Sequence, residues 1–173
     1  MPFMGKISWL LVFIFSCGAM SFAQPTAAAY AQKLKSLYKE TVPLVQSADL
    51  AQILAHSEQP LLLDSRSPEE FAVSHLLGAQ LVDFKGFRKE TAKAWEKNRL
   101  VVVYCTVGYR SERIGEQLLK MGFKNVHNLY GGIFEWVNQG HAIVDSQGNP
   151  TPKVHAYNQD WGQWLLKGEK VYR

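Results

Sequence analysis

A short β-branched run that ends in a cysteine constrains the fold of this chain more than any other feature. Residues 101–104, Val-Val-Val-Tyr, predict a buried strand, which stops at Cys105. A loop with a central Gly108 follows, and apolar residues at helical spacing predict a helix over 111–121. Parallel α/β sheets bind their ligands at the carboxyl ends of strands, beside helix N-termini. The sequence therefore places Cys105 where such a fold positions its chemistry.

Strands and helices alternate along the rest of the chain, which predicts an α/β fold with a mostly parallel central sheet and helices on both faces. At 173 residues and 47% hydrophobic content, the chain is long enough for one domain with a real core. Ser47 and Ser67 are the predicted N-caps of two helices. The further predicted strands cover 61–66, 79–83 and 125–130, and the predicted helices cover 24–38, 47–54, 67–74, 85–98 and 131–137.

The C-terminal segment differs in character from the alternating part. A turn cluster at 146–150 is predicted between two extended pieces, 142–145 and 153–157. Trp161, Trp164 and Leu165 then follow the i, i+3, i+4 spacing of one helix face. Core packing is the predicted role of this aromatic stripe, and a ligand platform is the alternative.

The first 23 residues follow the plan of a secretory signal peptide. Lys6 precedes the apolar run 7–15, and Ser21-Phe22-Ala23 forms a small-x-small cleavage site. The run is shorter than the about 20 residues that span a bilayer, so no membrane span is expected after cleavage. We therefore expect a periplasmic or secreted protein. In a second interpretation, residues 14–17 resemble a lipobox, which would leave a lipidated Cys17 as an anchor.

The cysteine count follows from this leader. The chain has two cysteines, and cleavage after Ala23 removes Cys17. Cys105 then has no internal disulfide partner in an oxidising compartment. Its place at a strand end argues against burial and favours a function, although an intermolecular disulfide is an alternative. The net charge is +4, and the basic residues are scattered among acidic ones and form no long run. This pattern argues against nucleic-acid binding.

The loop has features that favour an anionic sulfur. Only the thiolate of a cysteine is a strong nucleophile, and an ordinary thiol is mostly protonated at neutral pH. A helix N-terminus, inward-facing loop N–H groups and the cation of Arg110 would each stabilise the thiolate. Gly108 permits the backbone conformation that such a loop requires.

Cys105-Thr106-Val107-Gly108-Tyr109-Arg110-Ser111 resembles the active-site loop of rhodanese-like sulfurtransferases, in which Cys-x-x-Gly-x-Arg is frequent. Asp64-Ser65-Arg66 resembles the early Asp-x-Arg of this family. Residues 74–79 resemble its Gly-His-Ile-Pro-Gly-Ala segment, with Ser74 and Leu77 replacing the first glycine and the proline, and 128–132 resemble its last strand and Gly-Gly helix. The resemblance covers residues 45–140 and leaves 24–44 and 141–173 as N- and C-terminal extensions.

This resemblance implies that Cys105 accepts sulfur from a small anionic donor such as thiosulfate. The resulting persulfide would pass the sulfur to cyanide, a small thiol or a protein thiol. It also implies that the loop residues hold the donor and that Asp64 and Arg66 line or brace the loop, unless they form only a structural ion pair. The implied donor-binding residues are Thr106, Val107, Gly108, Tyr109 and Arg110. No cofactor and no metal are expected.

The spacing of Cys105 and Arg110 separates the alternatives. Six residues from Cys105 to Arg110 give a Cys-x4-Arg loop, whereas cysteine phosphatases and arsenate reductases resemble Cys-x5-Arg. A sulfur carrier or partner-binding module without turnover is the stronger alternative. His75 is predicted to be structural, and the five histidines show no metal-site spacing.

Overall fold

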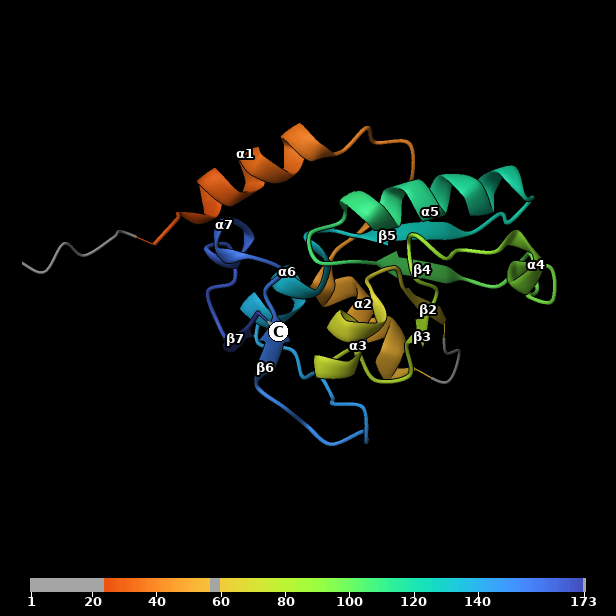
Figure 1. Ribbon diagram of the computed structural model, residues 1–173. Coiled ribbons are helices and arrows are strands. Elements are labelled where there is room, and N and C mark those ends of the chain that lie inside the picture. The colour runs from red at the N-terminus through yellow and green to blue at the C-terminus, as the bar shows by residue number, and fades with distance from the viewer. Residues whose placement is uncertain (1–23, 57–59, 173) are drawn as a thin grey trace, which may run out of the picture.

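A five-stranded parallel sheet forms the centre of the molecule in the computed structural model, which describes residues 24–56 and 60–172 (Figure 1). The strand order is β1-β5-β4-β2-β3, and every pairing is parallel. This confirms the predicted sheet. The strands are β1 (Leu44–Val45), β2 (Leu61–Asp64), β3 (Gln80–Leu81), β4 (Val101–Tyr104) and β5 (Val126–Leu129).

Helices cover both faces of the sheet, as predicted. Alternate residues of β4 enter different cores, because successive side chains of a strand point to opposite faces. Val101 and Val103 pack in one cluster with Ile114 of α5, and Val102 packs in the other with Leu50 of α2. The helices are α1 (Ala27–Leu37), α2 (Ser47–Ala55), α3 (Pro68–Val73), α4 (Lys89–Ala92), α5 (Tyr109–Lys120), α6 (Gly132–Asn138) and α7 (Gln159–Gly162).

The two extensions pack on the sheet domain and on each other. Tyr30 and Leu34 of α1 are buried, and the Tyr30 ring stacks on Trp164 with 5.4 Å between ring centroids. The C-terminal segment forms a small parallel sheet of β6 (Lys153–His155) and β7 (Glu169–Val171), and Leu165 behind α7 is buried. The N- and C-terminal extensions therefore meet beside α6, where α1 lies next to α7 (Figure 1).

Two helix predictions were wrong in detail. Ser47 is the first residue of α2 and not its cap: Gln46 precedes the helix and accepts the Leu50 N–H, and the buried Ser47 hydroxyl has no partner among the described residues. The helix predicted over 85–98 shrinks to the one-turn α4, because a turn at Asp83–Gly86 interrupts the segment and the bonds at Thr91, Lys93 and Trp95 run to the third residue before, as in isolated turns.

The C-terminal segment also differs from its prediction. The closing helix ends at Gly162, before Trp164 and Leu165, and the extended piece 142–145 makes only two isolated bridges, from Val144 to His75 and to Pro150. The predicted leader, with Cys17, lies outside the described residues. Across 24–56 and 60–172, the helices are too short or too polar to cross a membrane.

Candidate active site

Cys105 lies at the end of β4, where the loop before α5 begins. The residue is 1% exposed, so the expectation that its position argues against burial was wrong. Its carbonyl accepts the Ile133 N–H at 2.9 Å, which holds the start of the loop against α6 and removes it from solvent. Cys105 nevertheless lines a pocket of about 310 Å³, and the sulfur is reached through this pocket.

A small hydrogen-bond network holds the sulfur. The Gly108 N–H donates to Cys105 Sγ at 3.1 Å, and the Ser111 hydroxyl oxygen lies 3.6 Å from the same sulfur. Buried Asn128 of β5 fixes both partners, since its Nδ2 donates to the Gly108 carbonyl at 2.9 Å and its Oδ1 accepts from the Ser111 hydroxyl at 2.7 Å. Sequence reasoning missed Ser111 and Asn128 as parts of the site.

The loop backbone turns its carbonyls away from the pocket. The N–H groups of Ile133 and Phe134, in the first turn of α6, donate to the carbonyls of Cys105 and Thr106. Gly132 permits this approach, because a Cβ there would collide with the Cys105 carbonyl.

Gly108 ends the loop in the left-handed region, with φ of +97°, and α5 begins at the next residue. Within the described chain, the N–H groups of Val107, Tyr109 and Arg110 have no acceptor. These N–H groups form the kind of helix N-terminus that binds anions.

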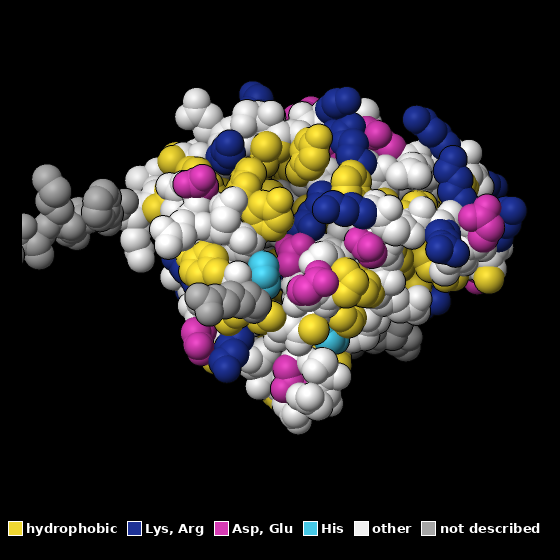
Figure 2. Space-filling view, in the orientation of Figure 1, with side chains coloured by type: hydrophobic (Ala, Val, Ile, Leu, Met, Phe, Trp, Pro, Cys, Tyr) yellow, Lys and Arg dark blue, Asp and Glu magenta, His cyan; other side chains and the backbone are white. Residues whose placement is uncertain are grey.

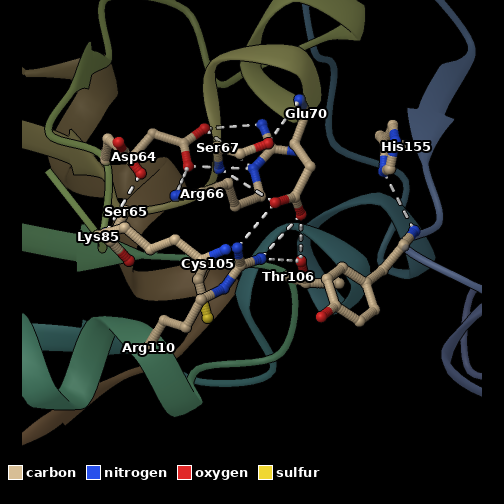
Figure 3. Close-up of polar contacts among 12 residues, drawn as sticks. Asp64, Ser65, Arg66, Ser67, Glu70, Lys85, Cys105, Thr106, Arg110 and His155 are labelled. Carbon is tan, nitrogen blue, oxygen red and sulfur yellow. Dashed lines mark hydrogen bonds and ion pairs between the residues drawn. The ribbon is translucent and has the colours of Figure 1, made fainter. Parts of the chain in front are cut away.

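Arg110 forms a bidentate ion pair with Glu70 of α3 (Figure 3). Its Nη1 and Nη2 donate to the two carboxylate oxygens at 2.7 Å each, and Nη2 also donates to the Thr106 hydroxyl at 2.8 Å. Although burial opposes ionisation, the Arg110 hydrogen bond and charge lower the pKa of Glu70 to about 2. Arg110, which was expected as a cation beside the sulfur, is thus paired with a carboxylate.

The same pairing acts on Arg110. Burial disfavours its charged form, but the Glu70 hydrogen bond and the nearby Cys105 sulfur outweigh burial and raise its pKa above the ordinary range. Sequence reasoning placed Glu70 in a helix start and did not assign it to the site. Its reciprocal bonds with Ser67 form a capping box, a signal that the sequence carries, but no local signal connects Glu70 to a residue 40 positions away.

Asp64 and Arg66 form a fully buried ion pair at 2.7 Å, to one side of Glu70 in the view of Figure 3. Arg66 Nη2 also donates to the Ser74 carbonyl at 2.6 Å, and its charge helps to lower the pKa of Glu70. Neither Asp64 nor Arg66 belongs to the described lining of the pocket. The side-chain hydrogen bonds of the pair join Asp64 to Arg66 and Arg66 to the Ser74 carbonyl, which fits the structural ion pair that was the alternative expectation. His75 stacks on Phe71 and contacts its carbonyl at 3.0 Å, as a structural histidine would.

Apolar side chains form the walls of the pocket. Thr106, Val107, Tyr109 and Arg110 line it with Cys105, whereas Gly108 contributes its N–H. Three further lining residues come from the extensions: Leu37, Tyr157 and Trp161. Hydrophobic side chains gather on this face between α1, α7 and the start of α5 (Figure 2). The aromatic stripe predicted as core therefore divides, with Leu165 in the core and Trp161 at the pocket.

Comparison with protein families gives a match over residues 47–139 to the rhodanese-like domain. A sulfurtransferase from Allochromatium vinosum is 35% identical over 104 residues, covering 60% of this chain and 96% of that protein. A tRNA uridine(34) hydroxylase from Pectobacterium carotovorum is 33% identical over 100 residues, which is 55% of this chain but 28% of the relative. The chain thus spans under a third of the length of that hydroxylase.

Solved structures share the fold. The crystal structure of a rhodanese-related protein from Thermoplasma volcanium has a TM-score of 0.53 and 25% identity, covering 59% of this chain and 97% of that one. A thiosulfate sulfurtransferase from Pseudomonas aeruginosa has a TM-score of 0.58 at 20% identity, over 79% of this chain and 26% of that one. At such identity the second likeness concerns the fold alone.

Proposed function

Because the chain belongs to the family of rhodanese-like domains, we propose that it is a sulfurtransferase that carries sulfane sulfur as a persulfide on Cys105. One observation carries this proposal: the Cys105 sulfur accepts the Gly108 N–H at 3.1 Å, and Cys105 lines a pocket beside loop N–H groups that have no acceptor in the described chain. A sulfur so placed suits a nucleophile that is anionic before and after sulfur loading.

Sulfur transfer takes two displacement steps. The Cys105 thiolate attacks the outer sulfur of thiosulfate, an S–S bond forms to the enzyme, and the S–S bond of thiosulfate breaks. Sulfite leaves with the electron pair of that bond, and the persulfide retains one negative charge. An acceptor such as cyanide then attacks the outer persulfide sulfur, and the Cys105 thiolate leaves as thiocyanate forms.

The loop N–H groups stabilise the negative charge in both steps. The groups of Val107, Tyr109 and Arg110 bind the donor anion or the outer persulfide sulfur, as N–H groups at a helix start do. Two donors of the Arg110 guanidinium, Nε–H and the second Nη1–H, are not used by Glu70 or Thr106. They add to the anion-binding site that the loop N–H groups form. Glu70 positions Arg110, and the charge of Arg66 helps to keep Glu70 ionised.

The site also bears on the alternatives. A carrier without turnover would use the same persulfide and differ only in its acceptor. The loop of cysteine phosphatases and arsenate reductases has one residue more between cysteine and arginine than the stretch from Cys105 to Arg110. The shorter loop favours sulfur transfer. The match covers only 28% of the hydroxylase from Pectobacterium carotovorum. The proposal therefore rests on the shared module and not on the activity of that relative.

We place this activity outside the cytoplasm, in the periplasm or medium, because the first 23 residues follow a signal-peptide plan. A lipid anchor through Cys17 is the alternative location. Cys105 is the free cysteine of the described chain, so any resolving thiol comes from a small molecule or a partner protein.

The test is a pair of measurements on the purified mature protein. With thiosulfate alone, intact mass should rise by about 32 Da, the mass of one sulfur atom, on Cys105. With cyanide added, thiocyanate should form continuously. Cys105→Ser, which nearly preserves the volume of the side chain, should show neither result while keeping the wild-type circular dichroism spectrum.

Each other outcome points elsewhere. Normal turnover by Cys105→Ser would refute the mechanism. A mass increase without thiocyanate would favour the carrier, and hydrolysis of an aryl phosphate without any sulfur adduct would favour the phosphatase.

A further inference from the structure

The walls of the pocket above Cys105 come in part from outside the segment that matches the family. Leu37 is the last residue of α1, and Tyr157 and Trp161 belong to the C-terminal segment. All three lie outside the matched residues 47–139. The two extensions therefore shape the route to the reactive sulfur.

The polar and apolar groups of the pocket are separated. The cysteine loop contributes the Cys105 sulfur and its N–H groups, whereas Leu37, Tyr109 and Trp161 present aliphatic and aromatic surface. Among the described lining residues Arg110 alone is charged, and its bidentate pair with a carboxylate offsets that charge. Such a pocket complements a molecule with an anionic sulfur end and an apolar body.

The backbone holds the walls in place. Tyr157 has φ of +65°, a conformation that side-chain-bearing residues rarely adopt, and its ring lies 5.7 Å from the Arg110 guanidinium carbon. Strained residues of this kind cluster at ligand sites. Trp161 is held by the Asn158 side chain, which accepts its backbone N–H at 3.0 Å. Tyr157 nevertheless remains 53% exposed, which leaves its ring available to a ligand.

We propose that this pocket selects small organic sulfur compounds with an apolar ring over inorganic thiosulfate. The inference rests on the proposed persulfide chemistry of Cys105 and adds its substrate class. A volume of about 310 Å³ accepts one ring-bearing molecule, at the small end of ligand pockets. Thiosulfate has no apolar part, so it would leave the walls formed by Leu37, Tyr157 and Trp161 without a contact.

An aromatic thiosulfonate is the matched probe, because it replaces one oxygen of thiosulfate with a ring. The Cys105 thiolate attacks its outer sulfur, the sulfur–sulfur bond of the donor breaks, and an arenesulfinate leaves with the electron pair. Charge balances, since one thiolate and one thiosulfonate give one persulfide and one sulfinate. The ring lies against the walls while the sulfur end faces the loop.

The experiment compares three donors: benzenethiosulfonate, methanethiosulfonate and thiosulfate. For each, kcat/KM with cyanide is divided by the rate constant of the same donor with free cysteine, which removes intrinsic reactivity. Burial of a ring in the pocket should favour benzenethiosulfonate over methanethiosulfonate by about 10- to 100-fold.

Two variants test the walls. Tyr157→Gly removes a ring at a backbone position that suits glycine, so the fold is retained, and it should lower the benzene-to-methane ratio by about threefold or more. Trp161→Ala should lower the same ratio. Trp164→Phe alters a nearby tryptophan that stacks on Tyr30 and is not a pocket-lining residue, and it should leave the ratio unchanged.

The outcomes separate this inference from the proposed function. Equal corrected rates for all three donors, with Cys105 persulfide formed, would overturn the inference and leave sulfur transfer standing. A ratio that Tyr157→Gly and Trp161→Ala do not change would also overturn it, as expected if this face instead receives a partner protein. Absence of persulfide with every donor would overturn the proposed function itself.

Discussion

Among single residues, Glu70 controls the charge of the site. It pairs with Arg110, accepts the Thr106 hydroxyl at 2.9 Å and closes the capping box of α3 by accepting the Ser67 N–H at 3.0 Å. One carboxylate thus connects the start of a helix to the loop that holds Cys105. Its neighbour Glu69 is exposed and makes none of these loop contacts.

The depressed pKa of Glu70 makes stability depend on pH. Its folded pKa of about 2 lies below the about 4.3 of an unfolded glutamate, so its contribution is fully present above about pH 5 and lost as pH falls toward 2. The difference corresponds to about 3 kcal/mol. Glu70→Gln should therefore lower the unfolding free energy at pH 7 by about 2–3 kcal/mol and flatten its decline below pH 5.

Urea unfolding at several pH values measures both effects, with Glu69→Gln as the exposed control. Curves for Glu70→Gln that run parallel to wild type between about pH 5 and 2.5 would show that Glu70 does not carry this dependence.

The chemistry of single residues was predictable where it follows from local sequence. Cys105 and its loop could be located because a β-branched strand, a glycine and a helix follow one another within a few residues. Glu70, Asn128 and Tyr157 could not, because each reaches the site through the sheet topology. The spacing of apolar residues along the sequence does not reveal a contact between α3 and α5.

Among the secondary-structure elements, the end of α1 supports the loop. The Tyr38 hydroxyl, next to the last residue of α1, donates to the Val107 carbonyl at 2.7 Å and accepts the Gly131 N–H at 2.9 Å. A Cβ at Gly108 would collide with this tyrosine, so glycine is required by contact as well as by its φ. The hydroxyl thus connects the cysteine loop to the start of α6.

Tyr38→Phe should therefore weaken both the fold and the activity. Leaving the Val107 carbonyl and the Gly131 N–H without this partner should cost about 1–3 kcal/mol of unfolding free energy. A loop displaced by a fraction of an ångström should lower kcat/KM for thiosulfate by about tenfold. Urea unfolding and thiocyanate formation measure the two effects.

Tyr130→Phe is the matched control, since Tyr130 packs edge-on against Tyr38 and its hydroxyl has no hydrogen bond to the described residues. Equal losses in Tyr38→Phe and Tyr130→Phe would contradict a specific role for the Tyr38 hydroxyl.

The predictability of the elements follows their length and pattern. The run 101–104 and the Ser67-Pro68 helix start gave correct positions for β4 and α3, because burial and capping act locally. The strands β1 and β7 were missed, since one has two residues and the other begins with Glu169-Lys170. Their pairing depends on neighbours that the local pattern does not reveal.

For the molecule as a whole, the packing of α1 decides whether the N-terminal extension is part of the fold. Leu34 is fully buried, in the same cluster as Ile133 of α6. The sequence left open whether this helix packs on the domain or acts as a tether. An amphipathic pattern shows which face of a helix is apolar but not which surface that face contacts.

Leu34→Ala should lower the unfolding free energy by about 2–5 kcal/mol, since it leaves a cavity in the shared core. Tryptophan fluorescence and circular dichroism should still report one coincident transition in urea. Leu77→Ala, at a leucine that is 70% exposed, should change the free energy by less than about 0.5 kcal/mol. Separate transitions, or a small effect of Leu34→Ala, would make α1 a peripheral attachment.

The packing of α1 against the start of α6 also bears on the order of folding. β4, its loop and α5 are adjacent in sequence, whereas the Tyr30 hydroxyl bonds to the Gly131 carbonyl 101 residues away. Contacts between distant residues form more slowly than local ones, because a long loop must close first. We therefore expect the cysteine loop to form before its apolar walls. During that interval the thiol is open to oxidants, and the last residues to fold are those that shelter it.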